Sequence, residues 1–313
     1  MDNSQAKEVI RHIIGEVNKG FLGKTEQVKL AVTAVCAGLH ILIEDRPGVG
    51  KTTLASALCK ALGLDFGRVQ FTPDLLPGDI TGMTVWDDKK REFLFHEGPI
   101  FHQAVMADEL NRAAARTQSA LLEAMQEGTV TVDGTRHELP HPFMVIATQN
   151  PSHFSGTFTL PESQLDRFGV SFTLGYPEVA WESRILTEYR NAAPLDSIGT
   201  ATTAEELLEL RNYIKNLPIQ DEVRDYLVNF AYRTRNTHQL TAGLTTRGLQ
   251  HLLALAQAFA AYEGRDFVIP EDIRLAAPSV ARHKLLLTPE MKIEHRTVDF
   301  VLDRIFEELP SPV

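Results

Sequence analysis

The stretch EDRPGVGKTTLA, residues 44–55, constrains the fold of this chain more than any other. The apolar run LHILIE precedes it, and the helical segment KTTLASALCKALG overlaps its end. A strand, a glycine-rich turn and a helix in this order form a phosphate-binding loop, whose pattern is Gly-x-x-x-x-Gly-Lys-Ser/Thr. Gly50, Lys51 and Thr52 fill the last three places, but Asp45 stands where the first Gly belongs. The sequence therefore predicts a nucleotide site built on an incomplete motif.

Such a loop points successive backbone N–H groups at phosphate oxygens from the start of a helix. Close approach of the backbone requires residues without a Cβ, and Gly48 and Gly50 supply them. We expect Lys51 to reach the β- and γ-phosphates and the Thr52 hydroxyl to bind Mg²⁺. The residues expected to contact the nucleotide are Pro47, Gly48, Val49, Gly50, Lys51, Thr52 and Thr53.

The mismatch at Asp45 leaves two interpretations. In the first, the Asp45 carboxylate points away from the loop and accepts the Gly48 N–H in an Asx-type turn, so the loop works without its first Gly. In the second, PGVGKTT is only a Gly-rich turn before a helix. The acids and the amide described below favour the first.

Strand-like and helical segments alternate as far as Pro177. The predicted buried strands are LHILIE, VQFT, QAVMADE, PFMVIATQNP and VSFTLGYP, and the predicted hairpins are MTVW with EFLF and TVTVDGTRHEL. This alternation predicts a parallel α/β sheet with hairpin insertions. Only helical periods follow, so we predict an α/β nucleotide-binding domain over residues 1–177 and an all-α lid domain over 178–313. The length of 313 residues suits two domains.

Polar residues end two of the predicted strands. Asp108 and Glu109 close QAVMADE, and Asn150 closes PFMVIATQNP. Because ligands of open parallel sheets bind at the carboxyl ends of the strands, we expect these side chains beside the loop. Asp108 is expected to hold Mg²⁺, Glu109 to orient or deprotonate a water, and Asn150 to bind the γ-phosphate and that water. The alternatives are two solvated acids that cap a helix near residue 112 and an Asn that caps the turn before Pro151.

Composition argues against several classes of protein. The net charge of -10 argues against nucleic acid as a ligand, because the phosphate backbone favours Lys and Arg. Cys36 and Cys59 lie in apolar helical runs without metal-ligand spacing, so we interpret both as small buried side chains. Charges interrupt the N-terminal segment, which predicts no signal peptide, and no apolar run approaches the roughly 20 residues of a membrane helix. We therefore expect a cytoplasmic protein without membrane insertion.

Together these motifs resemble an AAA+ ATPase, and specifically the MoxR family. The resemblance covers nearly the whole chain, and its most specific stretches are ADELNRAAARTQSALLEAMQEGTVTVDG, PFMVIATQNP and LPESQLDRF. It implies a P-loop NTPase core with a helical lid, ATP or ADP as the nucleotide, Mg²⁺ as the metal, and hydrolysis of ATP to ADP and phosphate. It also implies a ring, commonly hexameric, that acts as a chaperone-like remodeller of client proteins, often with a partner carrying a von Willebrand factor A domain.

The resemblance also assigns roles to single residues. Arg167, in QLDRF, matches the arginine finger, and Arg247, in GLTTRGL, matches sensor 2, although TTR departs from the family's Ser-Pro-Arg-like sequence. The alternative for each arginine is a surface ion pair. The segment FLGK near residue 21 resembles the one that lines the adenine pocket, and an Asp at position 45 is not foreign to the family. The Walker A, Walker B and sensor 1 roles fall on Lys51 and Thr52, Asp108 and Glu109, and Asn150.

Several functions stay open from the sequence alone. Besides a remodelling ATPase, they are a nucleic-acid motor, a magnesium-chelatase-like subunit, and a scaffold that binds ATP without useful turnover. Arg112 and Arg116 are either interface residues or solvated helix residues. Trp86, Phe93 and Phe95 of the first hairpin either face a central pore or client, or are ordinary half-buried strand residues.

Overall fold

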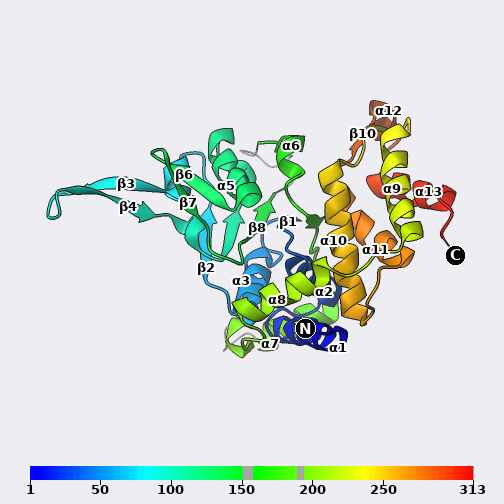
Figure 1. Ribbon diagram of the computed structural model, residues 1–313, viewed down its shortest axis with the longest axis horizontal. Helices are drawn as coiled ribbons and strands as arrows, with labels where there is room; N and C mark the ends of the chain where they lie inside the picture. The colour runs from blue at the N-terminus through cyan, green and yellow to red at the C-terminus, as the bar shows by residue number, and fades with distance from the viewer. Residues whose placement is uncertain (151–157, 189–193, 313) are drawn as a thin grey trace.

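A computed structural model describes residues 1–150, 158–188 and 194–312 of the chain (Figure 1). Its centre is a five-stranded sheet with the order β2-β5-β8-β1-β9, in which all neighbouring strands are parallel. The parallel α/β sheet is therefore confirmed. The strands are β1 (Ile41–Glu44), β2 (Phe66–Gln70), β5 (Ala104–Asp108), β8 (Met144–Gln149) and β9 (Val170–Phe172).

Helices cover both faces of the sheet. Successive side chains of a strand point to opposite faces, so alternate residues enter different hydrophobic clusters. In β5, Ala104 and Met106 join a cluster with residues of the first three helices, whereas Val105 and Ala107 join a cluster with residues of α5. A parallel sheet covered in this way presents its strand ends, not its faces, to a ligand. The helices are α1 (Asn3–Gly20), α2 (Thr25–Cys36), α3 (Lys51–Leu62), α4 (Pro77–Thr81) and α5 (Ala115–Glu127).

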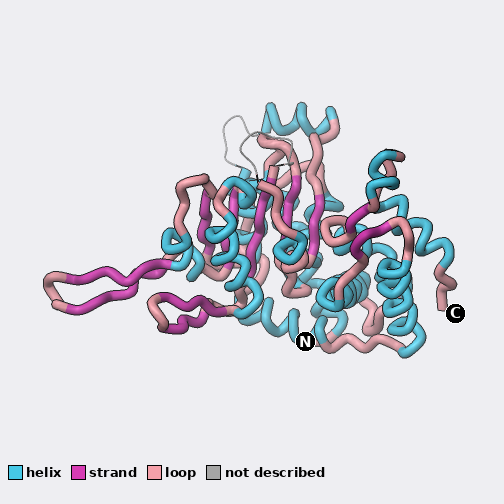
Figure 2. The backbone as a smooth tube through the Cα atoms, turned by 90° about the horizontal axis from the view of Figure 1, so that it is seen from above, coloured by secondary structure: helices cyan, strands magenta, loops and turns pink. Residues whose placement is uncertain are grey.

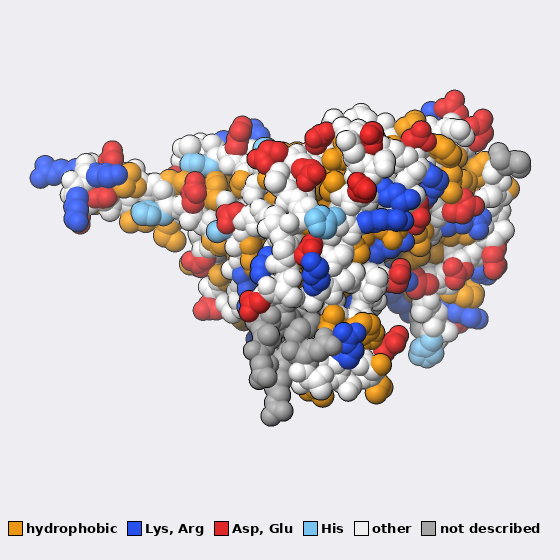
Figure 3. Space-filling view, turned by 90° about the horizontal axis from the view of Figure 1, so that it is seen from below, with side chains coloured by type: hydrophobic (Ala, Val, Ile, Leu, Met, Phe, Trp, Pro, Cys, Tyr) orange, Lys and Arg blue, Asp and Glu red, His pale blue; other side chains and the backbone are white. Residues whose placement is uncertain are grey.

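The long antiparallel hairpin β3 (Gly82–Asp87) and β4 (Glu92–Glu97) projects from the body (Figure 2). Basic side chains gather at its far end (Figure 3). Trp86 and Phe93 pair edge to face, with ring centroids 5.1 Å apart, and Phe93 is 70% exposed. Contact of this hairpin with a pore or a client stays a prediction.

The base of the long hairpin packs against the second hairpin. Phe95 stacks on His137 with ring centroids 4.1 Å apart. His137 belongs to the second predicted hairpin, formed by β6 (Thr129–Val132) and β7 (Thr135–Glu138). Phe95 is thus a half-buried packing residue, while the outer aromatic residues are exposed.

The C-terminal part of the chain is a helical lid, as predicted, with one exception. The prediction that no strand follows Pro177 is wrong, because β10 (Leu240–Ala242) and β11 (Leu286–Leu287) form an antiparallel ribbon. Such short strands carry no recognisable period in a sequence. The segment AWESRILTEYR, residues 180–190, has a helical period, and its last residues lie outside the described residues. The helices are α7 (Val179–Glu188), α8 (Ala204–Lys215), α9 (Asp221–Asn236), α10 (Thr246–Glu263), α11 (Pro270–Ala281), α12 (Pro289–Ile293) and α13 (Val298–Glu308).

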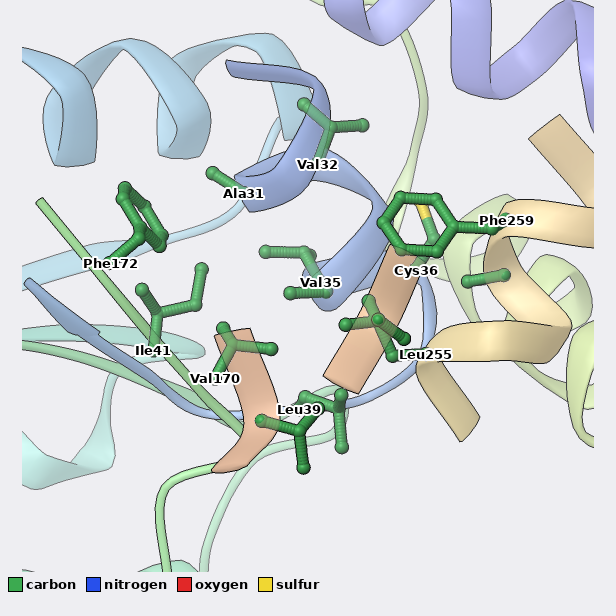
Figure 4. Packing of buried hydrophobic residues seen from close by; sticks show 14 of the residues in the cluster. Ala31, Val32, Val35, Cys36, Leu39, Ile41, Val170, Phe172, Leu255 and Phe259 are labelled. Carbon is green, nitrogen blue, oxygen red and sulfur yellow. The ribbon is translucent and has the colours of Figure 1, made fainter. Parts of the chain in front are cut away.

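The hydrophobic core continues from the sheet into the lid. Leu255 and Phe259 of α10 lie near Val35 and Cys36 of α2 (Figure 4). Because α10 shares this core with α2, a large displacement of the lid would expose apolar surface. The domain boundary between residues 177 and 178 stays a prediction.

Two expectations from composition can be compared with the structure. Cys36 and Cys59 are buried free thiols, as predicted, and burial raises the pKa of each to about 12. Both therefore stay protonated and act as small apolar side chains. Among the described residues, no helix is long and apolar enough to cross a membrane.

Candidate functional site

The loop between β1 and α3 contains two glycines in the left-handed backbone conformation. Gly48 and Gly50 have φ angles of 84° and 93°, in the left-handed region that Gly enters at low cost. A Cβ at Gly50 would lie 3.1 Å from the Phe21 ring, so the segment FLGK packs directly on the loop. Pro47 is exposed in this loop, and Thr52 lies in the first turn of α3.

The carboxylate of Asp45 shows how the loop tolerates its missing Gly. Its Oδ2 accepts the N–H groups of Leu174 and Gly175 at 2.8 and 2.7 Å, and its Oδ1 accepts the Arg46 N–H at 2.7 Å. The predicted hydrogen bond from the Gly48 N–H to Asp45 is wrong. The chain leaving β9 runs beside the end of β1 and offers two other N–H groups to the carboxylate. Asp45 therefore fastens the start of the loop to the segment that leads into the lid.

The mutation Asp45→Gly restores the general motif, yet we expect it to destabilise the protein. It removes three hydrogen bonds to a charged group, and we expect a loss of about 2 kcal/mol in the free energy of unfolding. Urea unfolding measures this loss. Asp88→Gly, in the exposed turn of the long hairpin, is the matched control. An Asp45→Gly protein as stable as the parent would contradict the anchoring role.

The ammonium group of Lys51 is buried at the centre of the site. It donates to the main-chain oxygens of Asp45 and Arg46 and, over 3.1 Å, to Oδ1 of Asn150. Burial lowers the pKa of Lys51, while nearby carboxylates oppose this shift. A cation held by carbonyl and amide dipoles is ready to exchange them for phosphate oxygens, which form stronger charge-assisted bonds.

The acids at the end of β5 are held by both neighbouring strands. Oδ1 of Asp108 accepts the Thr148 hydroxyl of β8 at 2.6 Å, and Oδ2 accepts Arg68 of β2 at 2.6 Å. Glu109 has a φ of 56°, and its N–H donates to the Thr148 hydroxyl at 2.9 Å. This left-handed residue turns Glu109 out of the strand direction, so the two carboxylates have different surroundings.

The carboxylate of Glu109 meets the amide of Asn150. Nδ2 of Asn150 donates to Oε1 of Glu109 at 2.9 Å, while Oε2 accepts Arg112 at 2.7 Å and Gln70 at 3.0 Å. A hydrogen-bonded chain therefore joins Lys51, Asn150 and Glu109. These contacts do not fit two solvated capping acids, and Arg112 belongs to the site.

Sequence reasoning missed three residues of this network. Arg68 and Gln70 come from β2, where their alternation marks one face of a strand, but only the pairing of β2 with β5 brings them to the acids. Thr148 of β8 precedes Asn150 by two positions, so the strand period offered the only signal in the sequence.

A cavity of about 550 Å³ lies over the loop. Trp181 of α7 packs on the FLGK segment so closely that a Cβ on Gly23 would lie 2.6 Å from its Cγ. Lys24 Nζ also donates to the Tyr176 carbonyl at 2.6 Å. The FLGK segment thus lines the cavity together with the lid helix α7, and its role at the adenine stays a prediction. The lining residues are Gly20, Phe21, Leu22, Lys24, Gly48, Val49, Gly50, Thr53, Tyr176, Pro177, Glu182, Ile185 and Leu186.

A larger cavity, of about 740 Å³, lies in the lid between α9 and residues 309–312. It is far in sequence from the loop and contains none of the polar strand ends. Cavity size alone therefore does not locate the candidate site. The smaller cavity is the candidate site, because it lies beside the loop residues that can bind phosphate.

The two arginines assigned by resemblance lie elsewhere. Arg167 precedes β9, at the amino ends of the strands, whereas the loop follows the carboxyl end of β1. Its guanidinium donates to the Leu122 carbonyl of α5. Arg247 lies 3.8 Å from the Asp166 carboxylate. Among the described residues that line the cavity over the loop, neither arginine is present.

The neighbourhood of Asp166 joins the core to the lid. Its carboxylate accepts the Thr245 hydroxyl at 2.9 Å and lies 3.4 Å from the buried Lys284 ammonium. Burial lowers the pKa of Lys284 to about 8, and Asp166 opposes this shift. Burial also lowers the pKa of His251 to about 3, so this ring stays neutral and its Nδ1 accepts Lys284 Nζ at 3.0 Å.

The residues present fit a magnesium ion bound together with a nucleotide. Thr52 offers a hydroxyl and Asp108 a carboxylate, and oxygen is the donor that Mg²⁺ prefers. In this structure the guanidinium of Arg68, whose side chain is 48% exposed, forms an ion pair with Oδ2 of Asp108 at 2.6 Å. No group of three or more His, Cys, Asp or Glu side chains that could hold a metal ion by itself occurs in the part of the chain that the structure describes.

Comparison with known proteins supports these features. The model of the ATPase family associated with various cellular activities (AAA) matches residues 40–170, and that of the AAA lid domain matches residues 232–305. The chain is 40% identical to the Bacillus subtilis protein YeaC over 96% of its own length and 94% of the relative. It is 34% identical to Chaperone MoxR1 of Mycobacterium tuberculosis over 97% and 82% of the two chains.

A solved structure agrees with the fold. A crystal structure from Cytophaga hutchinsonii, of a protein described as a candidate ATPase, superposes with a TM-score of 0.92 at 33% identity. The match covers 99% of this chain and 97% of that one.

Proposed function

This chain belongs to the MoxR family of AAA+ ATPases, and we propose that it hydrolyses ATP in a ring of identical subunits to remodel client proteins. A hexamer, and a partner with a von Willebrand factor A domain, are part of this proposal. They rest on the family resemblance alone.

One observation carries the catalytic part of the proposal. The hydrogen-bonded chain Lys51–Asn150–Glu109 connects the cation of the phosphate loop to a carboxylate through a single amide. A nucleotide whose γ-phosphate reached Lys51 would therefore lie beside both the amide and the base. The presence of Glu109 disfavours a scaffold that binds ATP without useful turnover.

The proposed steps use this chain's own groups. The N–H groups of the loop and the Lys51 ammonium hold the phosphates at the start of α3. Asn150 orients the attacking water, and Glu109 accepts its proton as the bond from the water oxygen to the γ-phosphorus forms. The bond between the γ-phosphorus and the oxygen bridging to the β-phosphate breaks, so that ADP leaves and phosphate is released. Thr52 and Asp108 are the residues that would hold Mg²⁺, which neutralises charge on the phosphates when bound.

The position of Arg167 supports assembly into a ring. Arg167 lies at the amino ends of the strands, and its own loop lies at their carboxyl ends. Arg167 therefore cannot serve its own loop, but it can reach the loop of a neighbour if subunits pack head to tail, and a head-to-tail contact that closes on itself produces a ring. We infer that Arg167 acts as an arginine finger in trans, with Arg247 on the same side of the subunit.

Lys51→Ala is expected to abolish detectable nucleotide binding. It removes the buried cation from the loop, and one charge-assisted contact to phosphate in such a site contributes several kcal/mol. Titration with a fluorescent ATP analogue measures the dissociation constant. Lys60→Ala, at the other end of α3, is the matched control and should bind as the parent does. Equal affinity of Lys51→Ala and parent would refute the phosphate-loop assignment.

A further inference from the structure

The two carbonyl groups on either side of Arg167 are held by one residue of the lid. Lys284 Nζ donates to the Asp166 carbonyl at 2.8 Å and to the Phe168 carbonyl at 2.7 Å. Lys284 lies in the turn after α11, and its side chain is 1% exposed. The main chain that carries Arg167 is therefore tied to the lid rather than only to its own sheet.

The chemistry of this contact makes it specific. An ammonium group has three N–H donors, and the carbonyls of Asp166 and Phe168 take two of them. The neutral His251 ring accepts at 3.0 Å, and the Asp166 carboxylate balances the charge at 3.4 Å. His283 also contacts the Phe168 carbonyl at 3.1 Å. No uncharged side chain of this length can bond both carbonyls and the imidazole at once.

The same lid also borders the nucleotide cavity of its own subunit. Tyr176 and Pro177, which lead into the lid, line that cavity together with residues of α7. Asp45, at the start of the phosphate loop, binds the N–H groups of Leu174 and Gly175 just before this segment. The lid thus lines the cavity over its own loop through α7, and through Lys284 it contacts the root of Arg167 at the other end of the strands.

We propose that Lys284 is a positioning residue that fixes the root of Arg167 to the lid, so that lid position in one subunit sets hydrolysis at the neighbouring site. This inference rests on the proposed action of Arg167 in trans. A side chain that moves from its productive position by about 1 Å can lose about 100-fold in rate. Lys284 is not expected to touch nucleotide.

The test measures binding and turnover separately in the full chain. For Lys284→Met we expect the dissociation constant of a fluorescent ATP analogue to stay within about twofold, while kcat falls about 100-fold. Mixing with Lys51→Ala subunits, which keep a well-placed finger but lack a working loop, should restore turnover. Lys284→Arg should retain much of the rate, because a guanidinium can also bond two carbonyls. Lys292→Met, exposed on α12, is the matched control.

Different failures have different meanings. A purely structural role for Lys284 predicts weaker nucleotide binding and no restoration by Lys51→Ala, and that result overturns the inference. If Lys284→Met does not fold, Lys284→Gln, which keeps two N–H donors, is judged by the same two criteria. If Arg167→Ala is fully active, Arg167 is not an arginine finger in trans, and the inference about Lys284 fails as well. ATP turnover that is lost in Glu109→Gln but kept in Arg167→Ala would leave only the catalytic part of the proposed function.

Discussion

Glu109→Gln is expected to keep ATP bound and to lower the rate of its hydrolysis by about 100-fold or more, the usual contribution of a general base. The substitution preserves size, and the amide can still accept from Asn150, which lies 2.9 Å from Oε1. It cannot accept a proton from water. Single-turnover and steady-state phosphate release, with ATP affinity measured separately, check this result.

The matched control for this variant is Glu123→Gln, an exposed glutamate of α5. It should leave both rate and affinity unchanged. Asp108→Asn should instead weaken magnesium-dependent binding, because it removes a charged oxygen donor. Hydrolysis by Glu109→Gln at the parent's rate would exclude Glu109 as the base.

Arg167→Ala is expected to bind ATP as the parent does and to lose about a thousandfold in turnover, the scale on which an arginine finger supplied in trans stabilises the transferring phosphoryl group. Dilution of the parent should lower its activity per subunit, because a site without a neighbour lacks its finger. Turnover measured from nanomolar to micromolar protein checks both statements.

A mixing experiment separates the two sides of the subunit contact. Arg167→Ala has a working loop, and Lys51→Ala has a working finger, so random rings made from equal amounts should complete about one interface in four. The double variant Lys51→Ala/Arg167→Ala is the control, and mixing it with either single variant should restore no ATP turnover. Activity that is independent of concentration, together with a fully active Arg167→Ala, would mean that the site is complete within one chain.

Much of the candidate site was accessible from the sequence because its residues lie at strand ends. Asp108 and Asn150 both end strands of one parallel sheet, and such strands bring their carboxyl ends to the same edge whatever their order. The helical lid was accessible through its 3.6-residue period, but the ribbon β10–β11 was not, because strands of two or three residues have no period.

Other contacts could not be predicted because they join segments that are distant in the chain. The sequence shows that Asp45 departs from the motif, but not that its carboxylate binds the chain after β9. It likewise offers no reason to place Arg68 on Asp108, since that contact requires β2 to lie next to β5.

The sequence by itself determined the phosphate loop, the alternating α/β core, the helical lid and the residue types expected at the strand ends, because each depends on local backbone geometry or side-chain period. Only the tertiary structure decided that Asn150 links Lys51 to Glu109 and that Lys284 holds the main chain on both sides of Arg167. These are partnerships through space, and they depend on strand order and on how the lid packs against the sheet.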